Sequence, residues 1–373
     1  MRPLTLDRDL VDRLAGTSGE GLVSILMPTH EKGPETAQDR IRLKNAVSEI
    51  DDLMDAAGWR RPTREEQLAP LRELLDDEDF WAHQGHGLAV YVADGGDLTP
   101  VAVGEPVDMT MSVAPSYHLR HLLPPLERER LAALILTKGA VGMFEVDRLR
   151  ANEMDVDLPR SMSDVNWFVD YESRINRHSD RKGSAGIQHG HDPTDRMHED
   201  VERFLRAVDD ALPTLDGPLA VLGDDPLVDA FSKVSSRQVI PLDLGGVDRS
   251  RWSTEVHRRV SEVIEERYRS RLTENREAAA EAMGTMDVAT LFPEALSDAG
   301  TGRLSAVFVR RGTAPVWGTY DPETFEAHAV ADRTVGTVDL VDRLVMVARS
   351  LGADICPMDD AVDGNDFVAV RRF

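Results

Sequence analysis

The 373-residue chain contains a single cysteine, Cys356, and this scarcity limits its chemistry from the start. One cysteine forms neither an internal disulfide nor a thiolate metal cluster, and its apolar, strand-like surroundings favour a small core residue over a nucleophile. No apolar run approaches the roughly 20 residues needed to cross a bilayer. The segment Met1–Arg8 also lacks the apolar core of a signal peptide. We therefore expect a cytoplasmic protein without a membrane partner.

Positive charge is also in short supply. The chain has 43 lysine and arginine residues against 67 aspartate and glutamate residues, which gives a formal net charge of −24. Nucleic-acid affinity comes from lysine and arginine side chains that displace counterions, so a surface built throughout to neutralise phosphates is excluded. We expect no DNA partner, and any contact with RNA has to be local.

The remaining composition is that of a globular protein, with 41% hydrophobic and 29% charged residues. Strand-like and helical patterns alternate along the chain, which predicts an α/β fold. We expect three consecutive α/β domains: an N-terminal domain over residues 1–125, a middle domain over 126–284 and a compact three-layer α/β domain over 285–373. The first boundary is placed at the proline pair Pro124-Pro125, which is expected to stop a short helix over residues 116–126.

The middle domain contains a long polar loop, predicted over residues 174–198 and followed by an amphipathic helix over 198–212. The loop is rich in glycine and histidine and has no apolar period, so it cannot build core and is expected to face a partner. Four basic side chains stand in it against Asp180: Arg174, Arg177, Arg181 and Lys182. They supply the local positive charge that contacts with phosphates require.

The same loop offers an alternative set of metal ligands. Three imidazoles and one carboxylate lie within ten residues: His189, His191, Asp192 and His198. A His-x-His pair on an extended segment points both rings the same way, as a metal site requires. The metallo-β-lactamase pattern, however, needs aspartate and histidine where this chain has Pro193 and Thr194. We therefore expect no metal and no other cofactor. No Gly-x-Ser-x-Gly motif of a serine hydrolase occurs either.

Several stretches outside the loop carry a family resemblance: Ser24–Glu35, Ile41–Asn45, Phe80-Trp81, Gly87–Ala89 and Tyr117–Leu123. Together with three α/β domains and a glycine-containing middle loop, they resemble the archaeo-eukaryotic class-1 peptide-chain release factors and their Pelota-like relatives. The resemblance is strongest to the bacterial branch of that superfamily, the bacterial archaeo-eukaryotic release factors. It covers nearly the whole chain and implies a ribonuclease-H-like middle domain. It also implies association with the ribosome and its RNA near the A site, in release, rescue or hibernation.

Release factors carry a Gly-Gly-Gln motif in the middle loop, and its glutamine helps water attack the peptidyl ester. The matching positions here are Gly186-Ile187-Gln188. The β-branched Ile187 restricts the backbone where glycine would leave it free, so this loop is not expected to reach the releasing conformation. Gln188 is the one catalytic candidate that the resemblance supplies. The residues expected to face RNA or a partner are Arg174, Arg177, Arg181, Lys182, Gly183, Gly186, Gln188, His189, Gly190 and His191.

We therefore expect a release-factor-like or Pelota-like protein with a translation-related role and without standard peptide-release chemistry. Two alternatives stay open: a metal-dependent hydrolase that uses the histidine-rich loop, and a non-enzymatic module that binds proteins through its C-terminal domain. An enzymatic activity, if there is one, would be hydrolytic. The decoding signatures of release factors are not recognisable in residues 1–115, so codon reading is not predicted.

Overall fold

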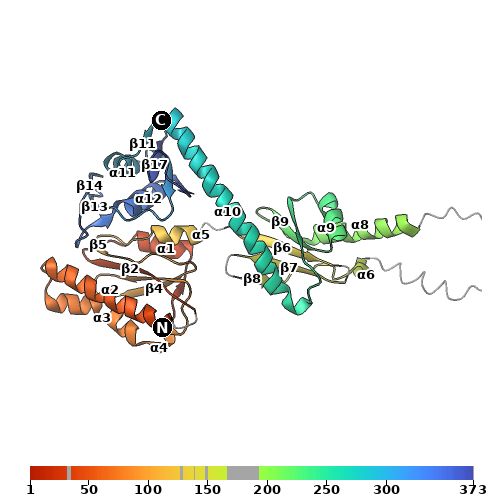
Figure 1. Cartoon of the computed structure of the whole chain (residues 1–373), viewed down its shortest axis with the longest axis horizontal. Helices are drawn as coiled ribbons and strands as arrows, with labels where there is room; N and C mark the ends of the chain where they lie inside the picture. The colour runs from red at the N-terminus through yellow and green to blue at the C-terminus, as the bar shows by residue number, and fades with distance from the viewer. Residues whose placement is uncertain (32–34, 127–128, 138, 148–149, 166–192, 373) are drawn as a thin grey trace, which may run out of the picture. The chain divides into compact units, whose positions relative to one another are not determined.

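The computed structural model describes residues 1–31, 35–126, 129–137, 139–147, 150–165 and 193–372 (Figure 1). By contacts between residues, the chain forms two compact units. The first joins residues 1–127 with residues 269–373, and the second consists of residues 128–268. The α/β fold class predicted from the sequence is confirmed in both units. The division into three domains stays a prediction.

The N-terminal part of the first unit is a five-stranded sheet. Its strands, in spatial order, are β1 (Leu4–Thr5), β4 (Leu98–Val103), β3 (Gly87–Val92), β2 (Leu22–Pro28) and β5 (Thr110–Ala114). The β1 strand pairs in parallel with β4, and all other neighbours are antiparallel. Because successive side chains point to opposite faces, the central strands β2 and β3 contribute to two buried layers.

Helices cover both faces of this sheet. On one face, Ile25 and Met27 pack against α2 (Thr36–Ala56), α3 (Arg61–Asp76) and α4 (Glu78–Trp81). The other face carries Leu22 and Leu26, which pack with four further elements. These elements are α1 (Arg8–Ala15), the 3₁₀ helix η1 (Arg120–Leu122), α5 (Leu123–Leu126) and α12 (Leu340–Ser350). The N-terminal sheet therefore shares a core with a helix from the far end of the chain.

The C-terminal part of the first unit contains two small sheets. The four-stranded sheet has the order β11 (Val288–Ala289), β17 (Phe367–Arg371), β12 (Leu304–Arg310) and β16 (Asp354–Met358). The three-stranded sheet has the order β14 (Ala327–Ala329), β13 (Trp317–Tyr320) and β15 (Val338–Asp339). Helices α11 (Phe292–Gly300) and α12 share a buried cluster with both sheets. Cys356 lies partly buried in β16, packed against apolar side chains, as predicted for a structural residue.

The second unit is built on one mixed sheet. Its order is β10 (Val239–Asp243), β9 (Leu219–Gly223), β6 (Leu131–Leu136), β7 (Val141–Val146) and β8 (Ala151–Glu153). The β6, β9 and β10 strands are parallel, while β7 and β8 continue the sheet as antiparallel neighbours. With β6 to β10 numbered 1 to 5 and the sheet read from β8 to β10, the strand order is 3-2-1-4-5. This is the arrangement expected of a ribonuclease-H-like domain.

The sheet of the second unit is also covered on both faces. On one face, Leu134 and Val221 pack with α8 (Pro193–Ala211) and α9 (Asp225–Val234), and α6 (Met162–Val165) adds Val165 to this layer. On the other face, Ala133 and Ala220 pack with α10 (Trp252–Thr285), which follows the 3₁₀ helix η2 (Arg249–Arg251). The α10 helix belongs to the second unit up to Tyr268 and to the first unit from Arg269.

Two boundaries differ from the sequence-based prediction. The proline pair does not stop the short helix, because both prolines lie inside α5, which begins at Leu123. Proline is tolerated there because the first helical turn needs no intrahelical N–H donor. The helix after the loop begins at Pro193, five residues before the predicted start at His198. The end of the predicted loop, residues 193–198, is therefore helical.

Candidate functional site

The predicted functional residues fall mainly outside the part of the chain that the structure describes. This holds for ten RNA- or partner-facing positions and for three positions of the alternative metal set: Arg174, Arg177, Arg181, Lys182, Gly183, Gly186, Gln188, His189, Gly190, His191 and Asp192. His198 lies in α8, where only the backbone is described. The roles given to these residues stay predictions.

The structure does describe the two helices that flank this segment. The α6 helix ends at Val165 and α8 begins at Pro193, so residues 166–192 start and finish in the second unit. Val165 and the completely buried Phe204 and Val208 of α8 belong to one hydrophobic cluster. The helices on either side of the segment thus pack on the same face of the sheet, α6 through Val165 and α8 from Val201 onward. A rigid scaffold of this kind is what a functional loop requires.

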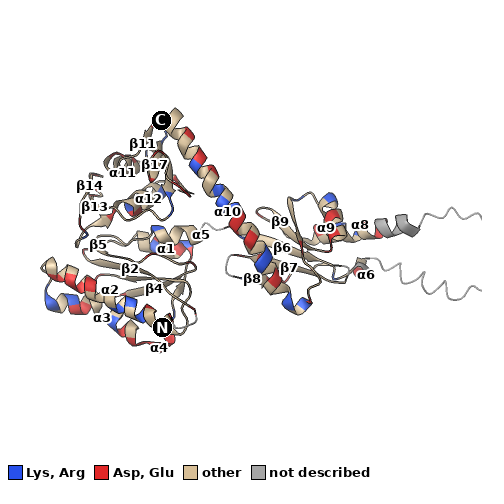
Figure 2. Ribbon diagram, in the orientation of Figure 1, with Lys and Arg blue, Asp and Glu red and all other residues tan. Residues whose placement is uncertain are grey.

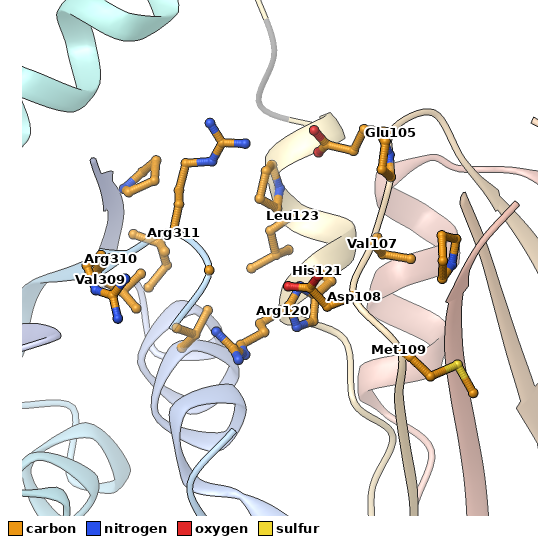
Figure 3. Close-up of a pocket in the computed structure, with 17 residues that line it drawn as sticks. Glu105, Val107, Asp108, Met109, Arg120, His121, Leu123, Val309, Arg310 and Arg311 are labelled. Carbon is orange, nitrogen blue, oxygen red and sulfur yellow. The ribbon is translucent and has the colours of Figure 1, made fainter. Parts of the chain in front are cut away.

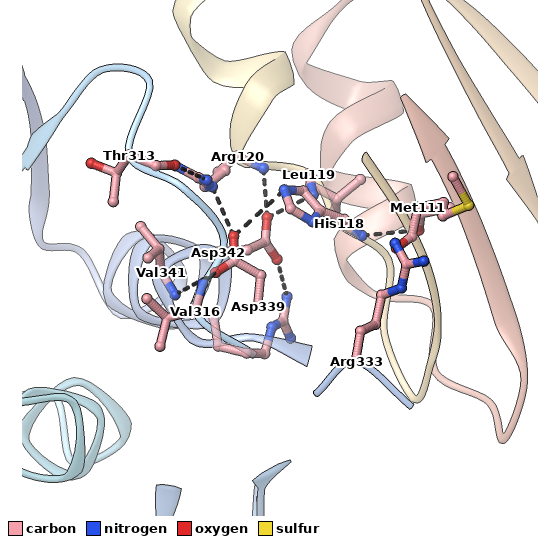
Figure 4. Close-up of polar contacts among 12 residues, drawn as sticks. Met111, His118, Leu119, Arg120, Thr313, Val316, Arg333, Asp339, Val341 and Asp342 are labelled. Carbon is pink, nitrogen blue, oxygen red and sulfur yellow. Dashed lines mark hydrogen bonds and ion pairs between the residues drawn. The ribbon is translucent and has the colours of Figure 1, made fainter. Parts of the chain in front are cut away.

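A second candidate region lies in the first unit, where the segment before α5 meets α12 (Figure 4). Asp339 and Asp342, at the start of α12, are 3% and 2% exposed. One oxygen of Asp342, Oδ1, accepts hydrogen bonds from the backbone N–H groups of Leu119 at 2.7 Å and Arg120 at 2.6 Å. Arg343 places its Nη2 atom 3.3 Å from the other oxygen. This carboxylate therefore joins two segments that are more than 200 residues apart in the sequence.

Asp339 is the N-cap residue of α12 and has a similar role. Its Oδ1 atom accepts hydrogen bonds from the backbone N–H groups of Val316 and Val341, both at 3.0 Å. Its Oδ2 atom accepts one from Nε of Arg120 at 2.9 Å, and Nη2 of Arg120 donates to the carbonyl oxygen of Thr313 at 2.6 Å. Burial raises the pKa of Asp339 to about 6, against the opposing effect of the nearby Arg120.

Two histidines complete this buried network. His118 and His121 stack with their ring centroids 5.1 Å apart and their planes at 18°. The main chain of His118 is fixed by Ser24, whose Oγ accepts from its N–H, and by the Tyr91 hydroxyl, which donates to its carbonyl oxygen. The ring nitrogens of His118, and Nε2 of His121, are buried without a hydrogen-bond partner among the described residues. Nε2 of His118 lies 3.7 Å from Asp339 Oδ2, which is too long for a hydrogen bond.

Burial keeps both rings neutral. It lowers the pKa of His118 well below the ordinary value and that of His121 to about 3. Arg120 and Arg343 also lower the pKa of His118, and His118 and Arg120 also lower that of His121. At 3% exposure His118 does not reach a substrate, so it has a structural role. The network joins the N-terminal sheet to α12 and fixes the orientation of the Arg120 guanidinium.

A partial signal for this network is present in the sequence. The stretch Tyr117–Leu123 carries part of the family resemblance, but no site is predicted from His118, Arg120 and His121. Their signal is three basic or titratable side chains among apolar ones. Their acidic partners come from α12 and could not be inferred from local pattern.

Neither a metal centre nor a membrane-spanning helix is found in the described residues. No group of three or more histidine, cysteine, aspartate or glutamate side chains in that part of the chain is arranged to hold a metal ion. No helix within the same residues is both long and apolar enough to cross a membrane. The alternative histidine set of the loop is not included in this result, because His189, His191 and Asp192 lie outside the described residues.

Residues 132–303 match the family described as Bacterial archaeo-eukaryotic release factor family 3. This match confirms the family resemblance predicted from the sequence, and it spans the whole predicted loop. No curated protein matches the chain.

Three solved structures are similar to the chain along most of its length. An archaeal translation termination factor is 13% identical over 99% of both chains, with a TM-score of 0.25. Pelota of Archaeoglobus fulgidus is 14% identical over 100% of this chain and 94% of that one, with a TM-score of 0.34. A model of ribosome-bound archaeal Pelota and ABCE1 is 12% identical over 99% and 95%, with a TM-score of 0.37. The release-factor resemblance therefore rests on the sequence match over residues 132–303.

Proposed function

We propose that this protein associates with the ribosome in a translation-related role such as rescue or hibernation, without standard peptide-release chemistry. The observation that carries the proposal is the release-factor family match over residues 132–303, because that segment contains the loop by which release factors act. The described geometry supports a presented loop, since the flanking helices α6 and α8 pack in one hydrophobic cluster of the second unit.

Charge favours this loop as the contact with ribosomal RNA. Lysine and arginine alternate with aspartate and glutamate along α2, α3 and α10, so these helices carry mixed charge (Figure 2). The first part of the predicted loop, residues 174–182, instead concentrates four basic side chains against Asp180: Arg174, Arg177, Arg181 and Lys182. In a chain of net charge −24, contacts with phosphates are expected where positive charge is locally in excess. The neighbouring glycines, Gln188 and the histidines would then approach RNA or a protein partner.

Ribosome sedimentation tests the proposal. Extracts of cells that express the protein are sedimented through sucrose at low and moderate salt, from growing and from starved cells. We expect the protein to travel with ribosomes, most clearly after starvation. The variant with Arg177, Arg181 and Lys182 all changed to alanine should bind at least about tenfold more weakly, with a smaller dependence on salt. Protein found only in the free fraction under every condition would contradict ribosome association.

A charge-matched variant provides the control. Arg130, Arg206 and Arg249 each have side chains 67% exposed and belong to the second unit. Changing all three to alanine removes the same formal charge without touching the loop, and exposed ion pairs of this kind contribute little to stability. This control should keep ribosome binding. If it lost binding as strongly as the loop variant, net charge and not the loop would explain the effect.

The peptide-release question has its own measurement. Hydrolysis of peptidyl-tRNA on ribosomes should stay at the uncatalysed rate, because Ile187 replaces the glycine that the releasing motif requires. The Gln188→Ala variant should keep both ribosome binding and folding stability. Peptide release that disappears in Gln188→Ala would show that the altered motif still supports hydrolysis.

The alternative functions stay predictions with separate tests. A metallohydrolase that uses His189, His191, Asp192 and His198 would hold about one equivalent of zinc, iron or manganese. A content below about a tenth of an equivalent in the purified protein would contradict this alternative. A protein-binding role of the C-terminal part predicts association with proteins that persists in the triple loop variant.

A further inference from the structure

A cavity of about 550 Å³ lies in the first unit, between parts of the N-terminal and C-terminal sheets (Figure 3). Three chain segments surround it: residues 105–109 before β5, residues 120–124, and residues 309–312 at the end of β12. The α12 and β16 elements close it with Val345 and Ile355. Its volume falls in the range of small-molecule sites in proteins, roughly 300–1,000 Å³.

The cavity wall is mostly aliphatic. Val107, Leu123, Val309, Val345 and Ile355 supply branched side chains, and four prolines add further apolar surface. None of the described residues that line it is phenylalanine, tyrosine or tryptophan. The one lining ring, that of His121, is already stacked on His118. The wall therefore suits a saturated carbon chain better than an aromatic base, which would need a stacking partner.

The polar groups at the cavity are held in place before any ligand arrives. The guanidinium of Arg120 is fixed by Asp339 and the Thr313 carbonyl oxygen, and that of Arg310 by two contacts with Asp366 at 2.6 and 3.1 Å. A guanidinium group has five N–H donors, so two contacts leave donors for a ligand on each. Side chains ordered in advance lose little further entropy when a ligand binds.

The His121 ring also lines the cavity, with its Nε2 atom buried behind the wall and without a hydrogen-bond partner among the described residues. Arg311, exposed at the turn after β12, brings a third guanidinium to the lining. The carboxylates of Glu105 and Asp108 also line the cavity. Figure 3 shows Arg120 and His121 projecting from one segment and Arg311 from the turn opposite.

We propose that this cavity binds a small aliphatic oxyanion. The charged end would contact the guanidinium groups, and the carbon chain would lie along the aliphatic wall. Guanidinium groups recognise carboxylates and phosphates alike, through paired N–H donors, so the headgroup is either of these. This site is separate from the loop of the proposed function, which belongs to the second unit.

The test uses the full chain and four probes: hexanoate, hexyl phosphate, hexan-1-ol and inorganic phosphate. Binding is followed by the NMR signal of the His121 ring and by the thermal midpoint of the first unit. We expect hexanoate or hexyl phosphate to bind with a Kd of about 1 mM or lower and to shift the His121 signal. The neutral alcohol and inorganic phosphate should bind at least about tenfold more weakly, because the alcohol lacks the charged headgroup and inorganic phosphate lacks the carbon chain. The stronger of the two anions identifies the headgroup.

Two variants locate the binding. Ile355→Trp fills the apolar part of the cavity and should abolish binding, while Arg311→Gln removes one charge and should weaken it about fivefold. Arg303→Gln is the matched control, because this arginine is 56% exposed in the C-terminal part but does not line the cavity. Binding that survives in folded Ile355→Trp, equal affinity for hexanoate and hexan-1-ol, or no binding at about 10 mM of either anion would each overturn the proposal.

Discussion

Asp342 is a single residue on which the packing of the first unit depends. One of its oxygens accepts two backbone N–H groups of the segment before α5, and the other lies beside Arg343. Removing the carboxylate leaves two buried donors without a partner. We expect Asp342→Ala to reduce the free energy of unfolding by about 3 kcal/mol, and Asp342→Asn to cost less because its amide oxygen still accepts both bonds. Urea unfolding followed by circular dichroism measures both.

An exposed aspartate of the same part of the chain serves as the control. Asp354, at the start of β16, is exposed, and its change to alanine should alter stability by no more than about 0.5 kcal/mol. If Asp342→Ala were as mild as Asp354→Ala, the two backbone contacts would not be important for stability.

His121 should make folding sensitive to acid. Its folded pKa of about 3 lies below the ordinary 6.5, so between these values the unfolded chain binds a proton that the folded chain does not. Stability from this residue is complete above pH 6.5 and is lost as the pH falls towards 3. His118 acts in the same direction. Asp339, with a pKa raised to about 6, acts in the opposite direction between pH 6 and its ordinary 3.8.

Comparison with a variant isolates the contribution of His121. His121→Gln cannot titrate in this range, so its unfolding free energy should fall less steeply between pH 6 and pH 4. The difference in slope should approach about 1.4 kcal/mol per pH unit, the linkage value for one proton. Parallel curves for parent and variant would mean that His121 is protonated in the folded protein or is accessible to water.

At the scale of the elements, the central strands of the second unit require a glycine at one position. Gly223 of β9 lies opposite Leu136 of β6, and a Cβ atom there would come within 1.9 Å of the Leu136 carbonyl oxygen. Since that neighbour is backbone, the strands would have to separate. We expect Gly223→Ala to destabilise the second unit by about 2 kcal/mol or more. Gly246→Ala, with no atom within 4 Å of the added Cβ, should be nearly neutral.

Thermal unfolding and hydrogen exchange of the two glycine variants measure this effect. Faster exchange in β6 and β9, without change in the sheets of the first unit, would support a local origin. A neutral Gly223→Ala would show that the close approach of β6 and β9 is not required.

The elements that the sequence predicted best are long or strongly apolar. The apolar run over residues 22–28 and the helical periods over 35–57 and 253–283 agree within one or two residues with β2, α2 and α10. Short edge strands such as β1 and β14, with two and three residues, are too short to show a period. The helix at Pro193 was placed too late because its first turn is polar and its apolar face begins further along.

The polar network and the cavity are long-range features, and local pattern does not contain them. Asp342 meets Leu119 across 223 positions, and the cavity joins residues near 107, 121, 310 and 355. Pairings of this kind follow from topology, which a single sequence constrains only weakly. The predicted loop is the opposite case, since its composition alone predicts a functional segment, and that role stays a prediction.

At the scale of the whole molecule, the two units have separate hydrophobic cores. The buried clusters of the second unit are formed by its mixed sheet with α8, α9 and the first half of α10. All other clusters belong to the first unit. Only α10 is common to both, and a helix alone transmits stability poorly once one of its supporting cores is lost.

We therefore expect the two units to unfold in separate transitions in differential scanning calorimetry. Asp342→Ala should lower the midpoint of one transition and Gly223→Ala that of the other. In the double variant, each unit should lose the same unfolding free energy as in the corresponding single variant, within about 0.5 kcal/mol. Hexanoate or hexyl phosphate, if bound in the cavity, should raise only the midpoint that Asp342→Ala lowers. A single transition that both variants shift equally would mean that α10 couples the cores into one cooperative unit. In that case, a ligand in the first unit would also stabilise the base of the loop in the second.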